Sequence, residues 1–525
     1  MKNILIIIVL YAFLPLLLLG QQRWEVIIEK QNMDYNVTST TYPYDAGIIL
    51  NAKTDWFNNW IIKTNTNGEK LWEKLVFSDN KPMIIYKVMQ NQNGEILICG
   101  AVDSHAFVLL LDGCGNLLWC NEYINYEHYS ESVHLDALFL NNGNIILLTS
   151  LYGDINYGYD VGLISFDSDG NLLWFKPYNL LVKYELLDMA VPLFIDSFDE
   201  FLIISGWCYY AYPDNPSVVW LRPLFIKTKS DYSEDWFLPY GMEDSIIGDA
   251  RGAISFNGEI IQGYGMYHKS GTINSILMNF DTVGNETEYI GIDNTEIGVD
   301  IDENFFLRLE IRDDTSYIAS AKFGNNGMSN PMGEWVMDSS GNVYQDQSHP
   351  NTTFSPLDPL FKTSNDKFVF AYQYNSSDIL LYKLNADLSQ AEIDTTTYTY
   401  DSLCNNLPII SDTIYLDNCS IVTGIDEAPT PEEYYASLKT INIVVMPNPA
   451  TDVVVFEIGV RGYNGSTTIS CYDVNGRKVF NKILPQNQTK IATDVTNWQS
   501  SIYIVVASGG NGSKGESKFV VTCLD

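Results

Sequence analysis

The sequence predicts an all-β chain in which a β-propeller, a ring of repeated antiparallel sheets, is followed by a small β-sandwich. Three observations predict this fold class. An eight-residue unit recurs through the first four fifths of the chain, short apolar strands and Gly-containing turns fill each period, and no segment between the units has a convincing helical pattern. Residues 439–525 lack the unit but keep the strand and turn signals.

The clearest copy of the unit runs from Asp167 to Trp174 and reads Asp-Ser-Asp-Gly-Asn-Leu-Leu-Trp. The segment from Asp112 to Trp119 repeats it closely, and residues 65–72 repeat it more loosely. In each copy an apolar run leads into a polar turn, and a short apolar strand ending in Trp follows. Because Gly supplies the positive φ that a tight turn needs, the unit predicts a β-hairpin.

Six copies are marked by a terminal aromatic residue, at positions 72, 119, 174, 236, 289 and 344, with spacings of 47 to 62 residues. A seventh copy at residues 385–389 lacks the turn glycine. Trp24, 48 residues before Trp72, looks like the orphan last strand of the pattern and would lend an extra strand that closes the ring. Periods of about fifty residues with three or four strands are typical of propeller blades. We predict seven blades, with six or eight as alternatives, over residues 21–419. The motif residues with a structural role are Trp72, Asp112, Gly115, Trp119, Asp167, Gly170, Trp174, Trp236, Asp281, Gly284, Asp338 and Gly341.

The unit resembles the Asp-box of sialidases, with a turn one residue longer, and the tryptophan-docking repeat of quinoprotein dehydrogenases, with a turn one residue shorter. In those families the motif joins blades and is not the active site, so the resemblance implies that Trp packs between blades. The run from Asp167 to Asn171 also resembles part of a calcium loop, but no Glu completes it. We therefore expect no metal site there.

The first twenty residues form a charged tip followed by an apolar run from Ile4 to Gly20, which predicts a signal peptide at 1–20. An uncleaved anchor is the alternative, but the run is short for a bilayer span. Export places the eight cysteines in an oxidising compartment. Proximity in sequence favours the pairs Cys114–Cys120, Cys404–Cys419 and Cys471–Cys523, with Cys99 and Cys208 buried and free.

Composition argues against several classes of function. The formal charge of −35 disfavours a nucleic-acid partner. The five histidines show no His-x-x-x-His spacing, no Gly-x-Ser-x-Gly elbow occurs, and the Gly-x-Gly-x-x-Gly match at Gly510 joins two late strands without opening a helix. The acidic stretch of Asp293, Asp300, Asp302 and Glu303 is typical of a solvated loop. The sequence therefore predicts no catalytic, cofactor-binding or metal residue and no cofactor, although carboxylates for a glycosidase are plentiful.

Aromatic residues gather in the segments between strands. They are Tyr123, Tyr126, Tyr129, Tyr152, Tyr157, Tyr159, Tyr209, Tyr210 and Tyr212, with Trp207 beside them. On a propeller rim such residues could stack on sugar rings or contact a protein partner. The alternative is that they pack at the blade edges.

Residues 420–438 are polar and contain two prolines and several acids, so we expect a linker. The domain after it, residues 439–525, alternates strands with a Pro-Asn-Pro turn and an Asn-Gly turn, which predicts a compact Ig-like β-sandwich.

This last domain resembles the type A C-terminal sorting domain of the type IX secretion system of the Bacteroidota. The matching residues are Pro447, Asn448, Pro449, Asp452, Asp473, Gly476, Arg477, Tyr503 and Lys518. The sequence departs from the pattern at Ser500 and Ser501, where Gly is usual, and at its non-basic end. An ordinary Ig-like accessory domain is the alternative.

The resemblance implies a secreted or cell-surface protein that is handled by the type IX machinery and has no membrane span after signal cleavage. We expect a non-catalytic binding or adhesion protein with a carbohydrate or protein ligand. A secreted glycan-active hydrolase or lyase on the same scaffold is the alternative. The sequence does not identify the ligand.

Overall fold

The structure is a computed structural model of the whole chain. It describes residues 24–29, 36–41, 47–79, 81–124, 135–152, 159–198, 201–212, 215–241, 246–255, 260–269, 272–292, 303–324, 332–349, 351–353, 359–375, 377–394, 412–423, 428–431, 433, 441–459, 466–485, 488–509 and 514–522. The predicted signal peptide, the acidic stretch from 293 to 302, and Cys404 and Cys523 lie outside the described residues. The chain divides into two compact units, Met1–Ala428 and Pro429–Asp525.

The described residues are almost entirely β-structure, so the predicted all-β class is correct. Apart from strands and turns, the first unit holds the one-turn helix α2 (Leu180–Lys183) and the 3₁₀ turn η2 (Leu416–Asn418). The expectation that no substantial helix separates the repeats therefore agrees with the described ranges.

The described residues of the first unit form seven sheets, whose strands pair antiparallel except for two late additions, and each sheet is named here by its place in the chain. Sheet 1 has β2 (Asn36–Thr41), β3 (Ile48–Lys53), β4 (Asn58–Thr64) and β5 (Lys70–Phe77), and sheet 2 has β6 (Met83–Gln90), β7 (Ile96–Val102), β8 (His105–Leu111) and β9 (Leu117–Tyr123). Sheet 3 has β10 (Leu135–Phe139), β11 (Ile145–Tyr152), β12 (Tyr159–Phe166) and β13 (Leu172–Pro177), and sheet 4 has β14 (Leu187–Phe198), β15 (Phe201–Tyr212), β16 (Asn215–Thr228) and β17 (Glu234–Pro239).

The remaining sheets follow the same order. Sheet 5 has β18 (Gly248–Ile254), β19 (Ile260–Lys269), β20 (Thr272–Asp281) and β21 (Glu286–Ile292), and sheet 6 has β22 (Glu303–Asp313), β23 (Ser316–Gly324), β24 (Met332–Asp338) and β25 (Val343–His349). Sheet 7 has β26 (Thr352–Thr353), β27 (Leu360–Lys362), β28 (Phe368–Tyr374), β29 (Asp378–Leu384) and, from the start of the chain, β1 (Glu25–Ile28).

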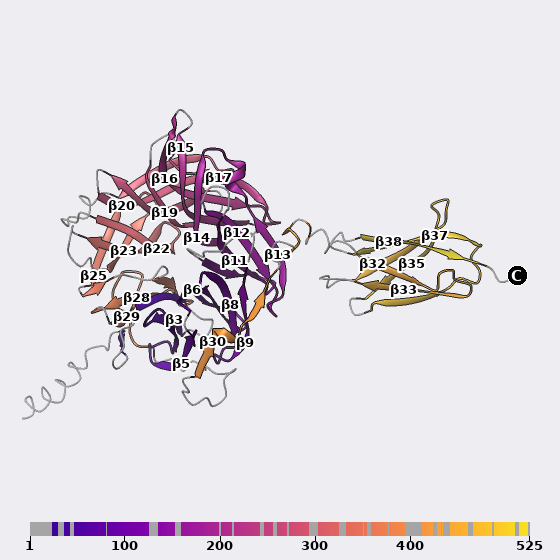
Figure 1. Cartoon of the computed structure of the whole chain (residues 1–525), viewed down its shortest axis with the longest axis horizontal. Helices are drawn as coiled ribbons and strands as arrows, with labels where there is room; N and C mark the ends of the chain where they lie inside the picture. The colour runs from indigo at the N-terminus through magenta and orange to yellow at the C-terminus, as the bar shows by residue number, and fades with distance from the viewer. Residues whose placement is uncertain are drawn as a thin grey trace, which may run out of the picture. The chain divides into compact units, whose positions relative to one another are not determined.

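The seven sheets follow one another around a ring, which Figure 1 shows along the colour gradient. The first strand of each sheet contacts the first strand of the next, from β2 through β6, β10, β14, β18 and β22 to β27, and β27 contacts β2 again. The arrangement is therefore propeller-like. The predicted closing strand is confirmed, because β1 pairs antiparallel with β29.

Packing between sheets explains why the strands are apolar on both faces. In β8 the side chains of Phe107 and Leu109 belong to the core between sheets 1 and 2, whereas those of Val108 and Leu110 belong to the core between sheets 2 and 3. Since successive residues of a strand point to opposite faces, a strand held between two sheets needs apolar residues at every position. The first unit thus has a series of seams between neighbouring sheets in place of one central core.

The segment after the last repeat returns to the first two sheets. Strand β30 (Asp412–Tyr415) pairs parallel with β5, and β31 (Ser420–Val422) pairs parallel with β9. Each adds a fifth strand at an outer edge, as Figure 1 shows for β30. We call residues 412–423 the return segment. Its β31 occupies the first residues of the segment that the sequence predicted as a linker.

Cys120 in β9 forms a disulfide with Cys419 of the return segment. The predicted pairs Cys114–Cys120 and Cys404–Cys419 are therefore wrong, although Cys114 is itself disulfide-bonded. Proximity in sequence was misleading because the return segment brings Cys419 back across 299 residues. The prediction that Cys99 and Cys208 are buried and free is confirmed.

The ring closes where the first and last repeats meet. The Trp24 indole N–H donates to the Thr66 carbonyl at 2.9 Å, and the Lys383 ammonium donates to the same carbonyl at 3.1 Å and to the Thr66 hydroxyl at 2.9 Å. Burial lowers the pKa of Lys383 to about 8, an effect that Asp394 partly opposes. Lys383 therefore helps to close the ring through its bonds to Thr66. Burial of its ammonium group opposes this stabilisation.

The second unit has two sheets around one core. A three-stranded sheet contains β32 (Asn442–Met446), β33 (Val453–Gly459) and β36 (Lys490–Asp494). A four-stranded sheet contains β35 (Lys478–Leu484), β34 (Thr467–Tyr472), β37 (Ser501–Gly509) and β38 (Lys514–Val521). Cys471 is buried in this core and free, so the predicted pair Cys471–Cys523 is wrong.

The double variant Cys120→Ser and Cys419→Ser should lose about 3 kcal/mol of unfolding free energy, because the disulfide closes a very long loop and holds the return segment on sheet 2. Urea unfolding of the oxidised protein measures this loss. Cys471→Ala, which removes a free thiol from the other unit, serves as the comparison for a cysteine without a bridge. Equal stability of the double variant and the wild type would show that the disulfide does not stabilise the first unit.

Lys383→Met should flatten the pH dependence of stability between about pH 8 and pH 10.5. The folded state holds the Lys383 proton more weakly than the unfolded chain does. The free energy of unfolding of the wild type therefore rises with pH through this window, and this gain is lost as the pH falls to about 8. The difference from wild type should span about 3 kcal/mol, measured by urea unfolding at several pH values. Parallel curves for the two proteins would contradict the assignment.

Candidate functional site

The repeat motif forms a turn of constant geometry. In the clearest copy one carboxylate oxygen of Asp167 accepts the N–H groups of Asp169 at 3.0 Å and Asn171 at 2.8 Å. Gly170 has φ +81 and donates its N–H to the Asp167 carbonyl at 3.1 Å. The same bonds recur at the turns that begin with Asp112, Asp281 and Asp338. The Asp side chain is thus occupied by its own turn.

The terminal Trp of one sheet lies on the motif turn of the next sheet. The Trp119 indole N–H donates to the Ser168 carbonyl at 2.9 Å, and a Cβ added to Gly170 would lie 2.8 Å from the Trp119 ring. Trp236 and Trp24 make the corresponding bonds to the carbonyls of Thr282 and Thr66. The turn glycine therefore supplies both the positive φ and the space that the indole occupies.

At the junctions of sheets 1 and 2 and of sheets 3 and 4, an indole also lies on the next turn, but with a different contact. The Trp72 ring lies beside Gly115, 3.2 Å from an added Cβ. Trp174 stacks on Tyr232 with ring centroids 5.2 Å apart, and Tyr232 adopts φ +60 at the position where other turns have Gly. All the sequence-predicted motif residues thus lie at junctions between sheets.

Strand register corrects the alignment of two repeats. Trp174 pairs with Ser165, just before the register shift at the turn, and the residues in the same position of sheets 5 and 6 are Glu288 and Gln345. Tyr289 and Tyr344, the aromatic residues taken as markers from the sequence, are each one position away from it. An aromatic ring near the expected spacing misled the alignment because these two copies have no Trp.

Polar side chains of the first strands meet near the centre of the ring. One carboxylate oxygen of Asp136 in β10 accepts the N–H of Ile195 in β14 at 3.0 Å, and the other lies 3.4 Å from the Lys87 ammonium of β6. Asp196 in β14 accepts the N–H of Ala253 in β18 at 2.9 Å. Each carboxylate therefore joins its own sheet to the next one.

The edge position of the first strands explains why these N–H groups are available. Strands β14 and β18 each stand at one end of their sheet and pair with a single neighbour. Alternate backbone N–H groups of an edge strand point away from that neighbour. A side chain of the preceding sheet accepts a hydrogen bond from such a donor.

The central carboxylates are poorly placed for catalysis. The side chain of Asp136 is 4% exposed and that of Asp196 is 15% exposed. Burial raises the pKa of Asp196, and the Arg308 guanidinium, 3.7 Å away, opposes this rise. Glycosidases need an acid and a base or nucleophile that reach the substrate, whereas these carboxylates are engaged by backbone donors and cations. Within the described ranges, no three His, Cys, Asp or Glu side chains are grouped so that they could bind a metal ion.

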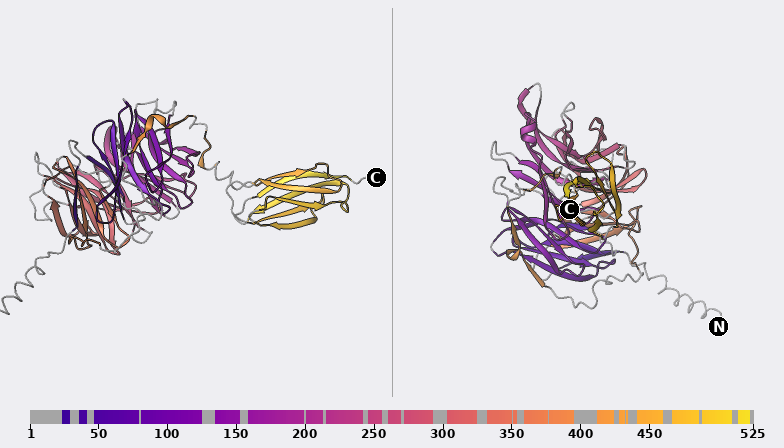
Figure 2. Two further views of the ribbon diagram at one scale, coloured as in Figure 1. Left: turned by 90° about the horizontal axis from the view of Figure 1, so that it is seen from below. Right: turned by 90° about the vertical axis from the view of Figure 1, so that its right-hand side faces the viewer.

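Sheet 4 carries a long hairpin with an exposed aromatic face. Strands β14 and β15 have 12 residues and β16 has 14, against 7 in β7 and β8. Figures 1 and 2 show the β15–β16 hairpin extending beyond the neighbouring sheets. Opposite residues share a face in antiparallel pairs, and the register places Met189, Trp207, Tyr209, Val219 and Leu221 on one face, here called the hairpin face.

The hairpin face is partly open to solvent. Tyr209 is 37% exposed and Val219 is 41% exposed. Trp207 is partly buried against the Val191 cluster and packs edge-on against Tyr209 with ring centroids 5.5 Å apart. An exposed tyrosine supported by a tryptophan and beside apolar residues is suited to contact a ligand surface.

The other predicted rim aromatics divide into two groups. Tyr123 is buried and stacks on Phe166, and Tyr210 is buried near Phe237, so both pack at sheet edges. Tyr159 is partly buried beside the Val191 cluster. The side chains of Tyr126, Tyr129, Tyr152, Tyr157 and Tyr212 lie outside the described residues.

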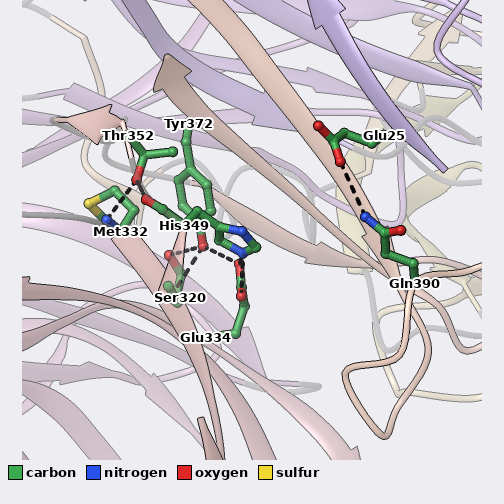
Figure 3. Close-up of polar contacts among 9 residues, drawn as sticks. Glu25, Ser320, Met332, Glu334, His349, Thr352, Tyr372 and Gln390 are labelled. Carbon is green, nitrogen blue, oxygen red and sulfur yellow. Dashed lines mark hydrogen bonds and ion pairs between the residues drawn. The ribbon is translucent and has the colours of Figure 1, made fainter. Parts of the chain in front are cut away.

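Sequence reasoning missed a buried polar cluster between sheets 6 and 7, shown in Figure 3. His349 Nε2 lies 2.6 Å and 2.8 Å from the two Glu334 carboxylate oxygens, and the Tyr372 hydroxyl donates to Glu334 at 2.8 Å. Glu334 is fully buried and His349 is 3% exposed. The cluster therefore ties two sheets together without reaching solvent. Glu334 and His349 lie on the paired strands β24 and β25, whereas Tyr372 comes from β28 of the next sheet, so no motif in the sequence could reveal the cluster.

The predicted sorting-motif residues form turns and core contacts in the second unit. Asn448 accepts the Val520 N–H at 2.9 Å, and Asp473 accepts the N–H groups of Asn475 and Arg477 at 3.0 and 2.9 Å. The backbone N–H of Arg477 lowers the pKa of Asp473. The buried Tyr503 donates its hydroxyl to the Gln499 carbonyl at 2.9 Å.

The remaining motif residues lie close to these contacts. Pro447 and Pro449 follow cis peptide bonds on either side of Asn448, and the Lys518 carbonyl faces the Asn448 amide at 3.4 Å. Gly476 takes φ +77 in the Asp473 turn, and the Asp452 carbonyl accepts the Val495 N–H at 2.8 Å.

Residues 444–522 match the family described as the secretion system C-terminal sorting domain. This segment is a type IX secretion system sorting domain, as its motifs predicted, and the protein is therefore secreted or displayed at the cell surface. Among the residues with described positions, no helix has the length and apolar character needed to span a membrane.

Solved structures resemble the chain only loosely. An extracellular domain from B. thetaiotaomicron aligns with TM-score 0.43 and 9% identity over 96% of this chain, which spans 59% of that domain. A GH93 α-L-arabinofuranosidase of Fusarium graminearum aligns with TM-score 0.37 and 9% identity over 69% of this chain and 97% of the enzyme. Drosophila Plexin A gives TM-score 0.39 and 9% identity over 69% of this chain and 87% of that one. These values are too low to transfer a ligand or an activity. A comparison with curated proteins gives no significant sequence match.

Gly170→Ala should destabilise the first unit by about 2–4 kcal/mol. The new Cβ would clash with the Trp119 ring, and the alanine would have to keep the positive φ of the glycine. Gly143→Ala is the matched control. Gly143 has φ +86 but open space around its Cβ position, so only the backbone cost of about 1 kcal/mol applies. Urea unfolding of both variants separates the steric cost from the backbone cost. If the two variants lose the same free energy of unfolding, the contact between the indole and Gly170 does not stabilise the protein.

Proposed function

We propose that this protein is an exported binding or adhesion protein whose repeat unit is a non-catalytic propeller for a carbohydrate or protein ligand. The hairpin face carries this proposal, because it presents an exposed tyrosine supported by a tryptophan on strands longer than the rest of the ring requires. Aromatic side chains contribute large contact areas with little loss of conformational freedom on binding. An acidic surface of net charge −35 keeps such a protein soluble and disfavours nucleic acid as the ligand.

The proposed architecture is a signal peptide at residues 1–20, a seven-bladed propeller and an Ig-like sorting sandwich. Seven sheets with cyclic contacts support the blade number, and two packed sheets support the sandwich. The propeller extends through the return segment, and the linker runs from there to residue 438. In this proposal the Trp, Asp and Gly residues of the repeat join the blades and do not contact ligand.

The sorting-motif residues shape the part of the second unit that the type IX machinery reads. Asn448, flanked by two prolines, fixes the first turn against β38, and Asp473 with Arg477 fixes the second turn. The Bacteroidota are the proposed source, since the resemblance is to their secretion system. The cargo is either released or attached to the surface after passage.

A glycan-active hydrolase remains the second candidate, because carboxylates do reach the centre of the ring. The bonds of Asp136 and Asp196 to backbone N–H groups and their proximity to cations favour a structural role instead. Release of reducing ends from a glycan library by the purified protein, abolished in Asp196→Asn, would establish the hydrolase in place of the binding protein.

Removal of residues 429–525 should keep the protein inside the cell envelope of a type IX-competent host, because the truncated chain lacks the sorting domain. Immunoblots of medium, surface and periplasmic fractions measure the distribution, and the full-length chain expressed from the same promoter is the reference. A truncated chain in the medium at the full-length level would refute the export role of the second unit.

The double variant Trp207→Ala and Tyr209→Ala should lose at least tenfold in affinity for whatever ligand a glycan array or surface-protein pull-down identifies, because both rings leave the hairpin face. Trp56→Ala is the matched control, since Trp56 is 67% exposed but lies on the β3–β4 hairpin of another sheet. Undiminished binding by the double variant would place the ligand elsewhere on the protein.

A further inference from the structure

The junction between sheets 5 and 6 lacks the indole found at the motif junctions described above. Glu288 pairs with Asn279 just before the register shift, as Trp174 pairs with Ser165. A carboxylate accepts hydrogen bonds and cannot donate to the turn carbonyl as an indole does. The side-chain amide of Gln262 donates to the Ser339 carbonyl instead, at 3.1 Å.

A cavity of about 540 Å³ lies at this junction. It is lined by Glu288 and Tyr289 from β21, by Gln262 and Asn279 from the two strands before it, and by Ser339 and Ser340 from the motif turn of sheet 6. At the junction between sheets 4 and 5 the Trp236 ring lies over the turn glycine Gly284, whereas the nearest side chain to a Cβ on Gly341 is that of Ile290. The volume is in the range of small-molecule sites.

The inner wall of this cavity is polar and fixed. Gln262 is 5% exposed, its side-chain oxygen accepts a short hydrogen bond from the Tyr317 hydroxyl, and its nitrogen donates to Asn279 at 2.6 Å. Such a network holds the amide in one orientation. A ligand here meets preorganised polar groups, which reduces the cost of binding.

The outer wall combines aliphatic groups with hydrogen-bonding groups. Ile260 is 52% exposed and Ile290 is half-buried, while Glu288 and Ser340 are exposed beside them. Tyr289 pairs with Met278, so its ring lies on the opposite face of β21. The cavity therefore offers an apolar surface on one side and several acceptors and hydroxyl groups on the other.

We propose that the cavity between sheets 5 and 6 binds a single neutral sugar ring. A pyranose has an apolar face for Ile260 and Ile290 and hydroxyl groups that donate to the Glu288 carboxylate and bond to the Ser340 hydroxyl. A purely aromatic ligand would leave these polar groups without partners, which is costly in a partly buried site. An anionic ligand would be repelled by Glu288. The site is separate from the hairpin face and does not depend on its ligand.

Saturation-transfer NMR of the full mature chain tests the proposal with D-galactose, D-mannose, L-fucose and N-acetyl-D-glucosamine as probes. At least one should bind with a dissociation constant on the order of 1–10 mM, as expected for a single ring. Glu288→Trp restores the indole of the other junctions and should weaken that binding at least tenfold by filling the cavity, without lowering the melting temperature. Glu288→Gln, which keeps the size but not the charge, should weaken it less.

Two control variants test whether the sugar binds in this cavity and not elsewhere on the ring. Gln345→Trp places the same indole at the next junction, where Gln345 donates to the Asp387 carbonyl at 2.8 Å, and should leave sugar binding unchanged. The variant Trp207→Ala/Tyr209→Ala should also bind the sugar normally, so failure of the hairpin proposal would be seen independently. The proposal is overturned if no probe binds, if folded Glu288→Trp binds undiminished, or if free indole binds in place of the sugars.

Discussion

An indole ring lying on the backbone of the next sheet's turn is the contact on which the order of the ring depends. It combines one hydrogen bond, as from Trp119 to the Ser168 carbonyl, with burial of a large apolar surface against a residue that has no side chain. Each sheet alone would leave both faces exposed. Because the contact repeats at a fixed position in the strand, it sets the distance between neighbouring sheets and also stabilises their packing.

Variation of this contact separates structural from ligand-accessible parts of the ring. Where Gln345 replaces the indole, its amide still donates to a turn carbonyl. Where Glu288 replaces it, the donor moves to the inner Gln262 and a cavity is left. A repeat protein can thus gain a site by losing one packing residue, since the neighbouring seams keep the sheets in place.

The ring is closed by segments from both ends of the first unit. Strand β1 completes the last sheet, and the return segment crosses the outer edges of sheets 1 and 2, where a disulfide holds it. At the centre, the side chains of Asp136 and Asp196 accept hydrogen bonds from the outward N–H groups of edge strands. These two acidic residues therefore serve the architecture of the ring.

Local patterns determined much of this protein. The hairpin turns, the all-β class, the closing strand at Trp24 and the sorting domain were predictable because each depends on residues close together in the chain or on a repeated period. Two repeats were misaligned by one residue, at Tyr289 and Tyr344, since an aromatic ring at nearly the right spacing resembles the missing Trp.

The tertiary structure alone decided the rest. The Cys120–Cys419 bridge joins segments 299 residues apart, and the Glu334–Tyr372 contact and the cavity beside Glu288 each join residues of neighbouring sheets. The sequence records the period of a repeat but not which side chains of neighbouring sheets meet across a seam. That meeting depends on strand register and on the path of the chain around the ring, so it appears only when the sheets are packed.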